Sequence, residues 1–298
     1  MAAEKITQRE AWLLAARPKT LSAAVAPVAV GTAAAVAVGK FSPLPALAAL
    51  TGALLLQIGV NLANDYFDFK RGIDSEGRKG PLRVTQAGLI SPAGVLGGMI
   101  AVFTAAAAVG LYLIAVGGWP ILILGTASIL SALAYSGGPW PLASHGLGEL
   151  FVFLFFGLAA VCGTFYVQAL EITPLAVAAA LPPGLLITAI IVVNNMRDIE
   201  SDGRTGKRTL AVRLGQRGSL AEYVLLILGA YILAILPWLR GMTGPWVLLT
   251  LLSLPRVRPL VRTLSKNCDD GPAMNGALAG TARLTLVFCV LFGIGLML

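Results

Sequence analysis

Nine predominantly apolar runs divide this chain, and each is about as long as a helix that crosses a lipid bilayer. Hydrophobic residues make up 57% of the sequence and charged residues only 12%, a composition that excludes a soluble globular protein. The runs lie near residues 21–39, 45–63, 93–116, 119–135, 147–169, 174–193, 219–239, 243–262 and 276–298. We therefore expect an all-α integral membrane protein with nine transmembrane helices in one domain, residues 1–298.

The basic residues indicate how the expected helices are oriented, because cytoplasmic loops are enriched in Lys and Arg. With the N-terminus in the cytoplasm, the predicted outer segments contain only Lys40 and Arg240. The run near 243–262 is the weakest, since Pro255 ends its purely apolar part, but without this run the last basic group would lie outside. Residues 1–16 then form a cytoplasmic amphipathic segment. The net charge of +8 reflects orientation in the membrane rather than binding of nucleic acid.

Two polar stretches lie where predicted helices leave the membrane. The first extends from Asn64 to Asp74 and the second from Asn194 to Asp202, and both follow runs predicted to cross from outside to inside. Together they hold seven of the fourteen acidic residues: Asp65, Asp68, Asp74, Glu76, Asp198, Glu200 and Asp202. Such clustering argues against ordinary juxtamembrane charges that only pair with one another. The sequence therefore predicts a functional site at the cytoplasmic face.

The spacing within these stretches suggests a metal site. On a helix, Asn64 and Asp68 share a face because they lie four residues apart. The same spacing places Asn194, Asp198 and Asp202 on one face. Carboxylate and amide oxygens suit Mg²⁺, which completes its shell with water and substrate phosphate, and nearby Lys and Arg would neutralise a diphosphate. The stretches look like one unit used twice, so we expect pseudo-repeated four-helix units that bring them face to face across a cavity.

These residues resemble the motifs of a known family, the UbiA superfamily of intramembrane prenyltransferases. Its two aspartate-rich motifs have the forms N-D-x-x-D, followed by a further Asp, and N-x-x-x-D-x-x-x-D, and both occur here. Within the superfamily the chain is most similar to the branch that acts on 1,4-dihydroxy-2-naphthoate in menaquinone biosynthesis. This likeness covers about residues 10–290 and rests on residues 61–68, 80–83, 135–142, 145–149 and 194–215.

The resemblance implies a fold, a reaction and a set of site residues. The fold is a nine-helix bundle in the bacterial cytoplasmic membrane, in contact with the lipid bilayer, with an active site that opens to the cytoplasm. The reaction is Mg²⁺-dependent transfer from polyprenyl diphosphate to 1,4-dihydroxy-2-naphthoate with loss of carbon dioxide, without nucleic acid or an obligate protein partner. The implied metal ligands are Asn64, Asp68, Asp74, Asn194, Asp198 and Asp202. The implied catalytic residues are Asp65, Asp68 and Asp198, and the substrate-binding residues are Asn64, Lys70, Arg83, Tyr135, Asn194, Arg197, Lys207 and Arg208.

Several interpretations stay open at the level of sequence. Asp65 would either deprotonate or orient the aromatic hydroxyl, or support the other motif residues. Tyr135 would shelter a carbocation or simply pack against its neighbours. A sister enzyme acting on 4-hydroxybenzoate or homogentisate would carry the same motifs, because acceptor choice depends on pocket shape. A secondary transporter is a rival class, but its charged residues usually lie near the bilayer midplane rather than at one mouth.

Overall fold

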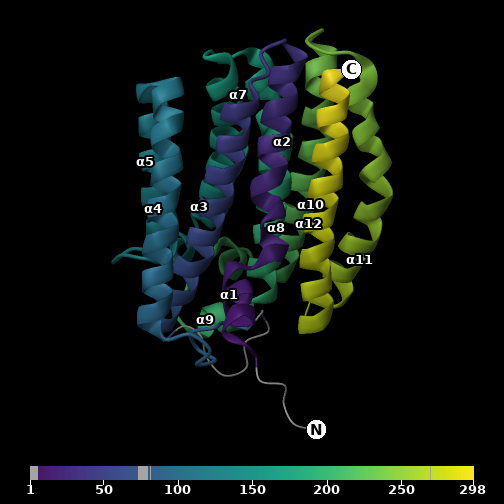
Figure 1. Ribbon diagram of the computed structural model, residues 1–298. Helices are drawn as coiled ribbons and strands as arrows, with labels where there is room; N and C mark the ends of the chain where they lie inside the picture. Colours follow the sequence, from purple (N-terminus) through teal and green to yellow (C-terminus); the bar gives the residue numbers. More distant parts are fainter. Residues whose placement is uncertain (1–5, 73–79, 81, 269) are drawn as a thin grey trace.

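The computed structural model describes residues 6–72, 80, 82–268 and 270–298, and every regular element among them is a helix. The long helices stand side by side in one bundle (Figure 1). The first half contains α1 (Gln8–Ala16), η1 (Pro18–Thr20), α2 (Ser22–Ala37), α3 (Pro43–Lys70), α4 (Pro92–Gly117) and α5 (Trp119–Ser136). The second half contains η2 (Ala143–His145), α6 (Gly148–Val152), η3 (Phe153–Ala159), α7 (Ala160–Ala169), α8 (Pro174–Arg197), α9 (Ile199–Arg204), α10 (Leu210–Leu239), η4 (Pro245–Arg256), α11 (Val257–Lys266) and α12 (Gly271–Met297).

Proline and capping side chains determine where the long helices begin. Helices α3, α4, α8 and α12 each have proline in the first turn, where its missing N–H removes no intrahelical hydrogen bond. Ser91, Thr173 and Asp270 cap α4, α8 and α12 by accepting a hydrogen bond from a backbone N–H. Gly118, at φ 69°, permits the tight turn between α4 and α5. These local signals explain why most of the predicted runs correspond to observed helices, although α3 and α10 extend beyond their runs.

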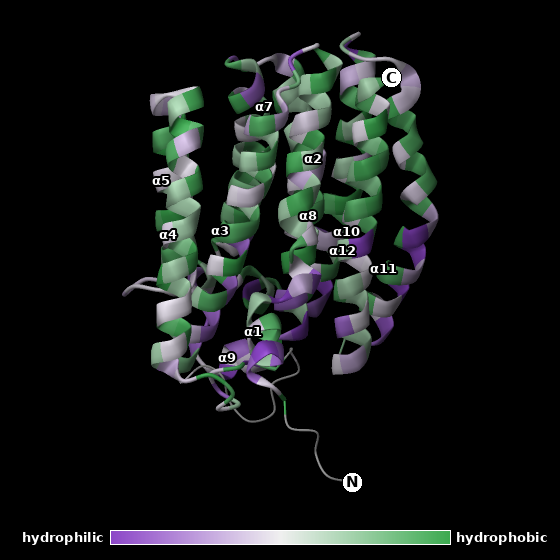
Figure 2. Ribbon diagram, in the orientation of Figure 1, coloured by the Kyte–Doolittle hydropathy of each residue, from purple (hydrophilic) through white to green (hydrophobic). Residues whose placement is uncertain are grey.

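Among the described residues, seven helical stretches are long and apolar enough to cross a membrane, namely α3, α4, α5, α6 through α7, α8, α10 and α12. An eighth results if α1 and η1 form one span with α2, from which they bend by 48°. The run predicted near 243–262 is the 3₁₀ helix η4 followed by α11, which lies beside α12 (Figure 1). Hydrophilic colouring gathers at the end of the bundle that holds α1 and α9 (Figure 2). The protein is therefore embedded in the membrane, with one polar end.

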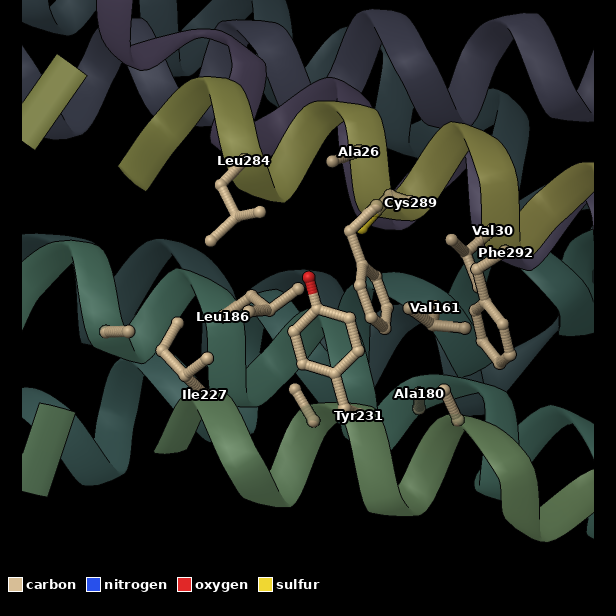
Figure 3. Packing of buried hydrophobic residues seen from close by; sticks show 14 of the residues in the cluster. Ala26, Val30, Val161, Ala180, Leu186, Ile227, Tyr231, Leu284, Cys289 and Phe292 are labelled. Carbon is tan, nitrogen blue, oxygen red and sulfur yellow. The ribbon is translucent and has the colours of Figure 1, made fainter. Parts of the chain in front are cut away.

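Two large hydrophobic clusters and a small third one, formed by Ala23, Val152 and Ile187, hold the described part of the bundle together by close packing, which drives helix association where lipid replaces water. The larger cluster draws on α2, α7, α8, α10, α11 and α12, and includes the buried side chains of Phe165 and Tyr223. Figure 3 shows Leu186 and Tyr231 pointing toward one another within it. The smaller cluster draws on α1, α3, α4 and α5, and includes Leu62. The chain is thus packed as two parts that meet along α2, α3 and α7.

Candidate active site

A cavity of about 970 Å³ lies among α2, α3, α4, α5, η3, α7, α8 and α12, so its walls come from both parts of the bundle. Most of the wall is apolar and includes Leu56, Ile129 and Phe155. Polar side chains gather where α3 and α8 end. They are Asn64, Asp68, Arg83, Tyr135, Ser136, Asn194, Asn195, Asp198, Asp202 and Lys207. An apolar cavity with one polar mouth suits a ligand that has an anionic head and an apolar chain.

Helix α3 carries the first aspartate-rich stretch on its last two turns. Asp68 is 6% exposed and accepts a hydrogen bond from Nη2 of Arg83 at 2.8 Å. Asn64, one turn earlier, accepts a hydrogen bond on Oδ1 from the Ser136 hydroxyl at 2.5 Å. Both side chains line the mouth, as their spacing on the helix predicts. Asp74 lies outside the described residues.

Asp65 has a different environment from its neighbours. It is 1% exposed and is not part of the cavity lining. Its two carboxylate oxygens accept hydrogen bonds from the backbone N–H groups of Val84 and Thr85, both at 3.2 Å. The carboxylate therefore anchors the segment that holds Arg83 beside Asp68. This geometry favours the supporting role of Asp65 over the acid–base role.

Alanine at Asp65 is expected to lower the free energy of unfolding by about 2–4 kcal/mol, because two charge-assisted bonds disappear and two buried N–H groups lose their acceptors. Thermal unfolding in detergent, with and without the substitution, measures the loss. Asp65→Asn should recover part of the stability, since its Oδ1 still accepts one of the two bonds. Unchanged stability in Asp65→Ala, combined with loss of activity, would instead indicate acid–base chemistry.

Arg197, the last residue of α8, organises the second aspartate-rich stretch. Its guanidinium donates to both carboxylate oxygens of Asp198, at 2.8 and 2.5 Å, in a bidentate pair. The same group donates to Oδ1 of Asn194 at 3.0 Å and to Oδ1 of Asn275, on α12, at 2.8 Å. Arg197 is buried and is not part of the cavity lining, whereas Asn194 and Asp198 are. Arg197 therefore fixes the motif residues from behind the mouth.

Lys207 connects the two stretches. Its Nζ lies 3.9 Å from Oδ2 of Asp68 and 3.7 Å from Oδ1 of Asp202. Its backbone N–H also donates to the carbonyl oxygen of Asp202 at 2.9 Å, which holds the start of the side chain in place. The two aspartate-rich stretches thus lie on opposite sides of one mouth, as the pseudo-repeat predicts. One ammonium group stands between their carboxylates.

Of the three remaining predicted substrate-binding residues, one lines the cavity and two do not. Tyr135, near the end of α5, lines the cavity. Lys70 is exposed, with Nζ 5.9 Å from the centre of the Tyr66 ring, and Arg208 is exposed as well. Neither of these two cations belongs to the cavity lining, although both are close in sequence to motif residues. A predicted site residue that is close in sequence to the motifs therefore does not always line the mouth of the cavity.

The structure adds cavity residues that the aspartate-rich motifs do not include. Arg17 and Lys19, between α1 and α2, bring two cations to the wall. Asn195 lines the cavity and donates from Nδ2 to Oε1 of the buried Glu149 at 2.8 Å. A local signal for the first pair exists, since Arg17 and Lys19 directly precede the first apolar run. The Asn195–Glu149 contact depends on the fold and has no local signal.

Fold and site together define a membrane-embedded helical protein whose apolar cavity ends in two facing sets of carboxylates and amides. The sequence model of the UbiA prenyltransferase family matches residues 24–266 of this chain. The chain belongs to this family. It is 38% identical over 304 residues to an Escherichia coli protein named 1,4-dihydroxy-2-naphthoate octaprenyltransferase, covering 100% of this chain and 98% of that one. A Mycobacterium tuberculosis protein of the same name is 39% identical over 244 residues, 82% of each chain.

Solved structures share the fold. A UbiA homologue from Aeropyrum pernix superimposes with a TM-score of 0.67 at 18% identity, over 91% of this chain and 96% of that one. A UbiA homologue from Archaeoglobus fulgidus, bound to GPP and Mg²⁺, gives a TM-score of 0.64 at 18% identity, over 96% of this chain and 99% of that one. At these identities the likeness concerns the arrangement of the helices.

Proposed function

We propose that this protein transfers a polyprenyl group from polyprenyl diphosphate to the ring of 1,4-dihydroxy-2-naphthoate, with release of diphosphate and carbon dioxide. The product would be demethylmenaquinol, an intermediate of menaquinone biosynthesis. One observation carries the proposal: both aspartate-rich stretches lie at the mouth of a cavity whose remaining wall is mostly apolar. A prenyl diphosphate has the same division into an anionic head and an apolar chain. The names of the bacterial relatives support the choice of acceptor.

The donor chemistry at the mouth fits Mg²⁺. The oxygen donors there are those of Asn64, Asp68, Asn194, Asp198 and Asp202, with Asp74 as a proposed ligand outside the described residues. Each stretch thus offers an amide and one or two carboxylates, which is the share of ligands that Mg²⁺ commonly takes from protein. In the described part of the chain, no three His, Cys, Asp or Glu side chains form a metal-binding group by themselves. When bound, Mg²⁺ would stabilise the negative charge that develops on the leaving diphosphate.

Lys207 and Arg83 are the proposed contacts for the diphosphate. Lys207 stands between the two aspartate-rich stretches, and Arg83 lies beside Asp68. Cations fixed at this place neutralise charge as the C–O bond of the prenyl donor breaks and diphosphate leaves. The apolar wall excludes water from the allylic carbocation, and Tyr135 and Phe155 present aromatic rings to the cavity. The electron-rich naphthoate carbon can then attack the carbocation.

Arg17 and Lys19 are the proposed contacts for the acceptor carboxylate, because they line the same cavity and cations recognise carboxylates. We expect Arg17→Gln to raise KM for the naphthoate by about tenfold, because one charge-assisted hydrogen bond is lost. KM for the prenyl diphosphate should change by less than about threefold. Steady-state kinetics with each substrate varied in turn separates the two. Arg9→Gln, exposed on α1, is the matched control. A larger increase in KM for the prenyl diphosphate than for the naphthoate would instead indicate that Arg17 binds the prenyl diphosphate.

We also propose that nine helices cross the bacterial cytoplasmic membrane, with the N-terminus and the mouth of the cavity in the cytoplasm. A 3₁₀ helix rises about 2.0 Å per residue and an α-helix about 1.5 Å. The 12 residues of η4 and the 10 of α11 therefore reach roughly 39 Å, enough to cross the hydrocarbon core. In a cysteine-free background, an impermeant maleimide should label Gln8→Cys only from the cytoplasmic side and Lys40→Cys only from outside. Reversed labelling would contradict the orientation.

The reaction is tested with purified protein in nanodiscs, a polyprenyl diphosphate, a panel of aromatic acceptors, and either Mg²⁺ or a chelator. Mass spectrometry should detect a decarboxylated prenyl-naphthoquinol that forms only with Mg²⁺. A product from 4-hydroxybenzoate or homogentisate alone would support prenyl transfer but contradict the proposed acceptor and the role in menaquinone biosynthesis. Absence of product from every acceptor, with folded protein, would overturn the enzyme proposal.

A further inference from the structure

The end of η4 and the outer surface of α11 carry cations that the catalytic proposal does not use. Arg256, Arg258, Arg262 and Lys266 lie within eleven residues and are all exposed. In Figure 2 the lower part of α11, toward the polar end of the bundle, is coloured as hydrophilic. None of the four belongs to the lining of the large cavity. They therefore stand on a helix surface that faces the surroundings of the protein.

The neighbouring elements offer these cations little negative charge. The sequence has no Asp or Glu between Glu222 and Asp269, so η4 and α11 contain none. Helix α12, which packs against α11, adds the exposed cation Arg283 and contains no acid, and α10, which packs against both η4 and α11, contains one acid, Glu222. Asp270, just before α12, accepts a hydrogen bond from the Ala273 N–H as the cap of that helix. Within the described ranges, the ion pairs that form lie elsewhere, and none includes a cation of α11.

An open groove runs beside these cations. It is lined by Leu254, Val257, Arg258, Val261, Arg262, Ser265 and Lys266. Residues four apart lie on one helix face, so Arg258, Arg262 and Lys266 form one row. Val257 and Val261 form the adjacent row, and Leu254 continues it into η4. The groove thus presents a cationic row and an apolar row side by side along the helix.

We propose that this groove binds an anionic phospholipid of the surrounding bilayer. Arg258 and Arg262 hold the phosphate, because the planar guanidinium matches phosphate oxygens in a bidentate geometry, and Lys266 adds a third positive charge. An acyl chain lies along Val257 and Val261. Cations near the hydrocarbon boundary are costly without a counter-charge, and an anionic headgroup supplies one at the required depth. A zwitterionic headgroup fits less well, since its own ammonium is repelled by the row.

The test is lipid retention by the full-length protein. Protein purified in detergent with equal amounts of phosphatidylglycerol and phosphatidylcholine is analysed by native mass spectrometry over a lipid titration. The wild type should retain phosphatidylglycerol in preference. In the double variant Arg258→Gln with Arg262→Gln, the apparent affinity should fall about 25-fold, since the loss of each cation lowers it roughly fivefold. The matched control, Lys40→Gln with Arg240→Gln, changes the same charge outside this groove and should retain the lipid as the wild type does.

Two results would overturn the proposal. One is equal retention of phosphatidylglycerol by the double variant and the wild type. The other is retention of phosphatidylcholine by the wild type to the same extent as phosphatidylglycerol. That result would mean that the groove binds acyl chains and does not distinguish the charge of the headgroup. Should the double variant fail to fold, Arg262→Gln compared with Arg240→Gln decides the same question. Arg258→Lys with Arg262→Lys should keep the preference for the anionic lipid, because the charge of the row is unchanged.

Discussion

Alanine at Asp68 or at Asp198 is expected to lower kcat by about a thousandfold, equal to roughly 4 kcal/mol of transition-state stabilisation. Each carboxylate lines the mouth of the cavity, and they come from the two facing aspartate-rich stretches. Removing either one removes an oxygen ligand from one side of the proposed Mg²⁺–diphosphate site. Each substitution also leaves a buried guanidinium, Arg83 or Arg197, without its carboxylate. Release of diphosphate at saturating substrates and Mg²⁺ measures kcat.

The control for these variants is Glu200→Gln. Glu200 belongs to the second stretch but pairs with Arg204 on the exposed surface, and it is not part of the cavity lining. An exposed pair contributes little, so we expect kcat to change by less than about twofold. Thermal unfolding establishes that all three variants are folded. Folded Asp68→Ala or Asp198→Ala protein with wild-type kcat would remove that carboxylate from the proposed site.

Phenylalanine at Gly125 is expected to shorten the prenyl donors that the protein accepts. A Cβ added at this position on α5 meets no atom within 4 Å, and the residue lines the apolar part of the cavity. Gly125 lies eleven positions before Ser136 at the mouth, a rise of roughly 16 Å along the helix, so only the far part of a long chain reaches it. A phenyl ring there would occupy the space of that part of the chain. We expect kcat/KM for a forty-carbon donor to fall by about 10- to 100-fold, the usual cost of overpacking.

A ten-carbon donor distinguishes this effect from general damage. Because its chain ends nearer the mouth, its kcat/KM should stay within about threefold of the wild-type value. Gly97→Phe is the matched control, since Gly97 on α4 is exposed, lies outside the cavity lining and also has open space around an added Cβ. An equal loss for both donors in Gly125→Phe would show that the ring disturbs the site itself rather than the chain path.

The helices of this protein could be predicted from sequence because their signals are local. Apolar length, first-turn prolines and caps such as Ser91 and Thr173 all act within a few residues. The predicted ends were less accurate. The run near 45–63 continues as α3 to Lys70, since the polar residues from Asn64 onward extend the helix into the mouth. The 3₁₀ winding of η4, which packs against α12 and α10, was not predicted, because the apolar pattern of the sequence is the same for either winding.

The site could be predicted in part for the same reason. The i, i+4 spacing of Asn64 and Asp68 is a local pattern, and both side chains do line one mouth. The adjacent Asp65 could not be assigned from sequence, because its partners are backbone groups of a segment near Val84 whose path depends on the fold. The family resemblance implied that Arg197 binds substrate. Its place behind the mouth follows from Asn275 on α12, far away in the sequence.

The cavity lies where the two separately packed parts of the bundle meet, so whatever occupies it also contributes to keeping them together. A ligand that binds only the folded state adds RT ln(1 + [L]/Kd) to the free energy of unfolding, about 2.7 kcal/mol at a hundredfold excess over Kd. The empty protein lacks this contribution, so that opening between its two parts would cost less free energy. Opened molecules are those that membrane proteases remove. The amount of this protein in a cell would therefore follow the supply of its prenyl donor, even at a constant rate of synthesis.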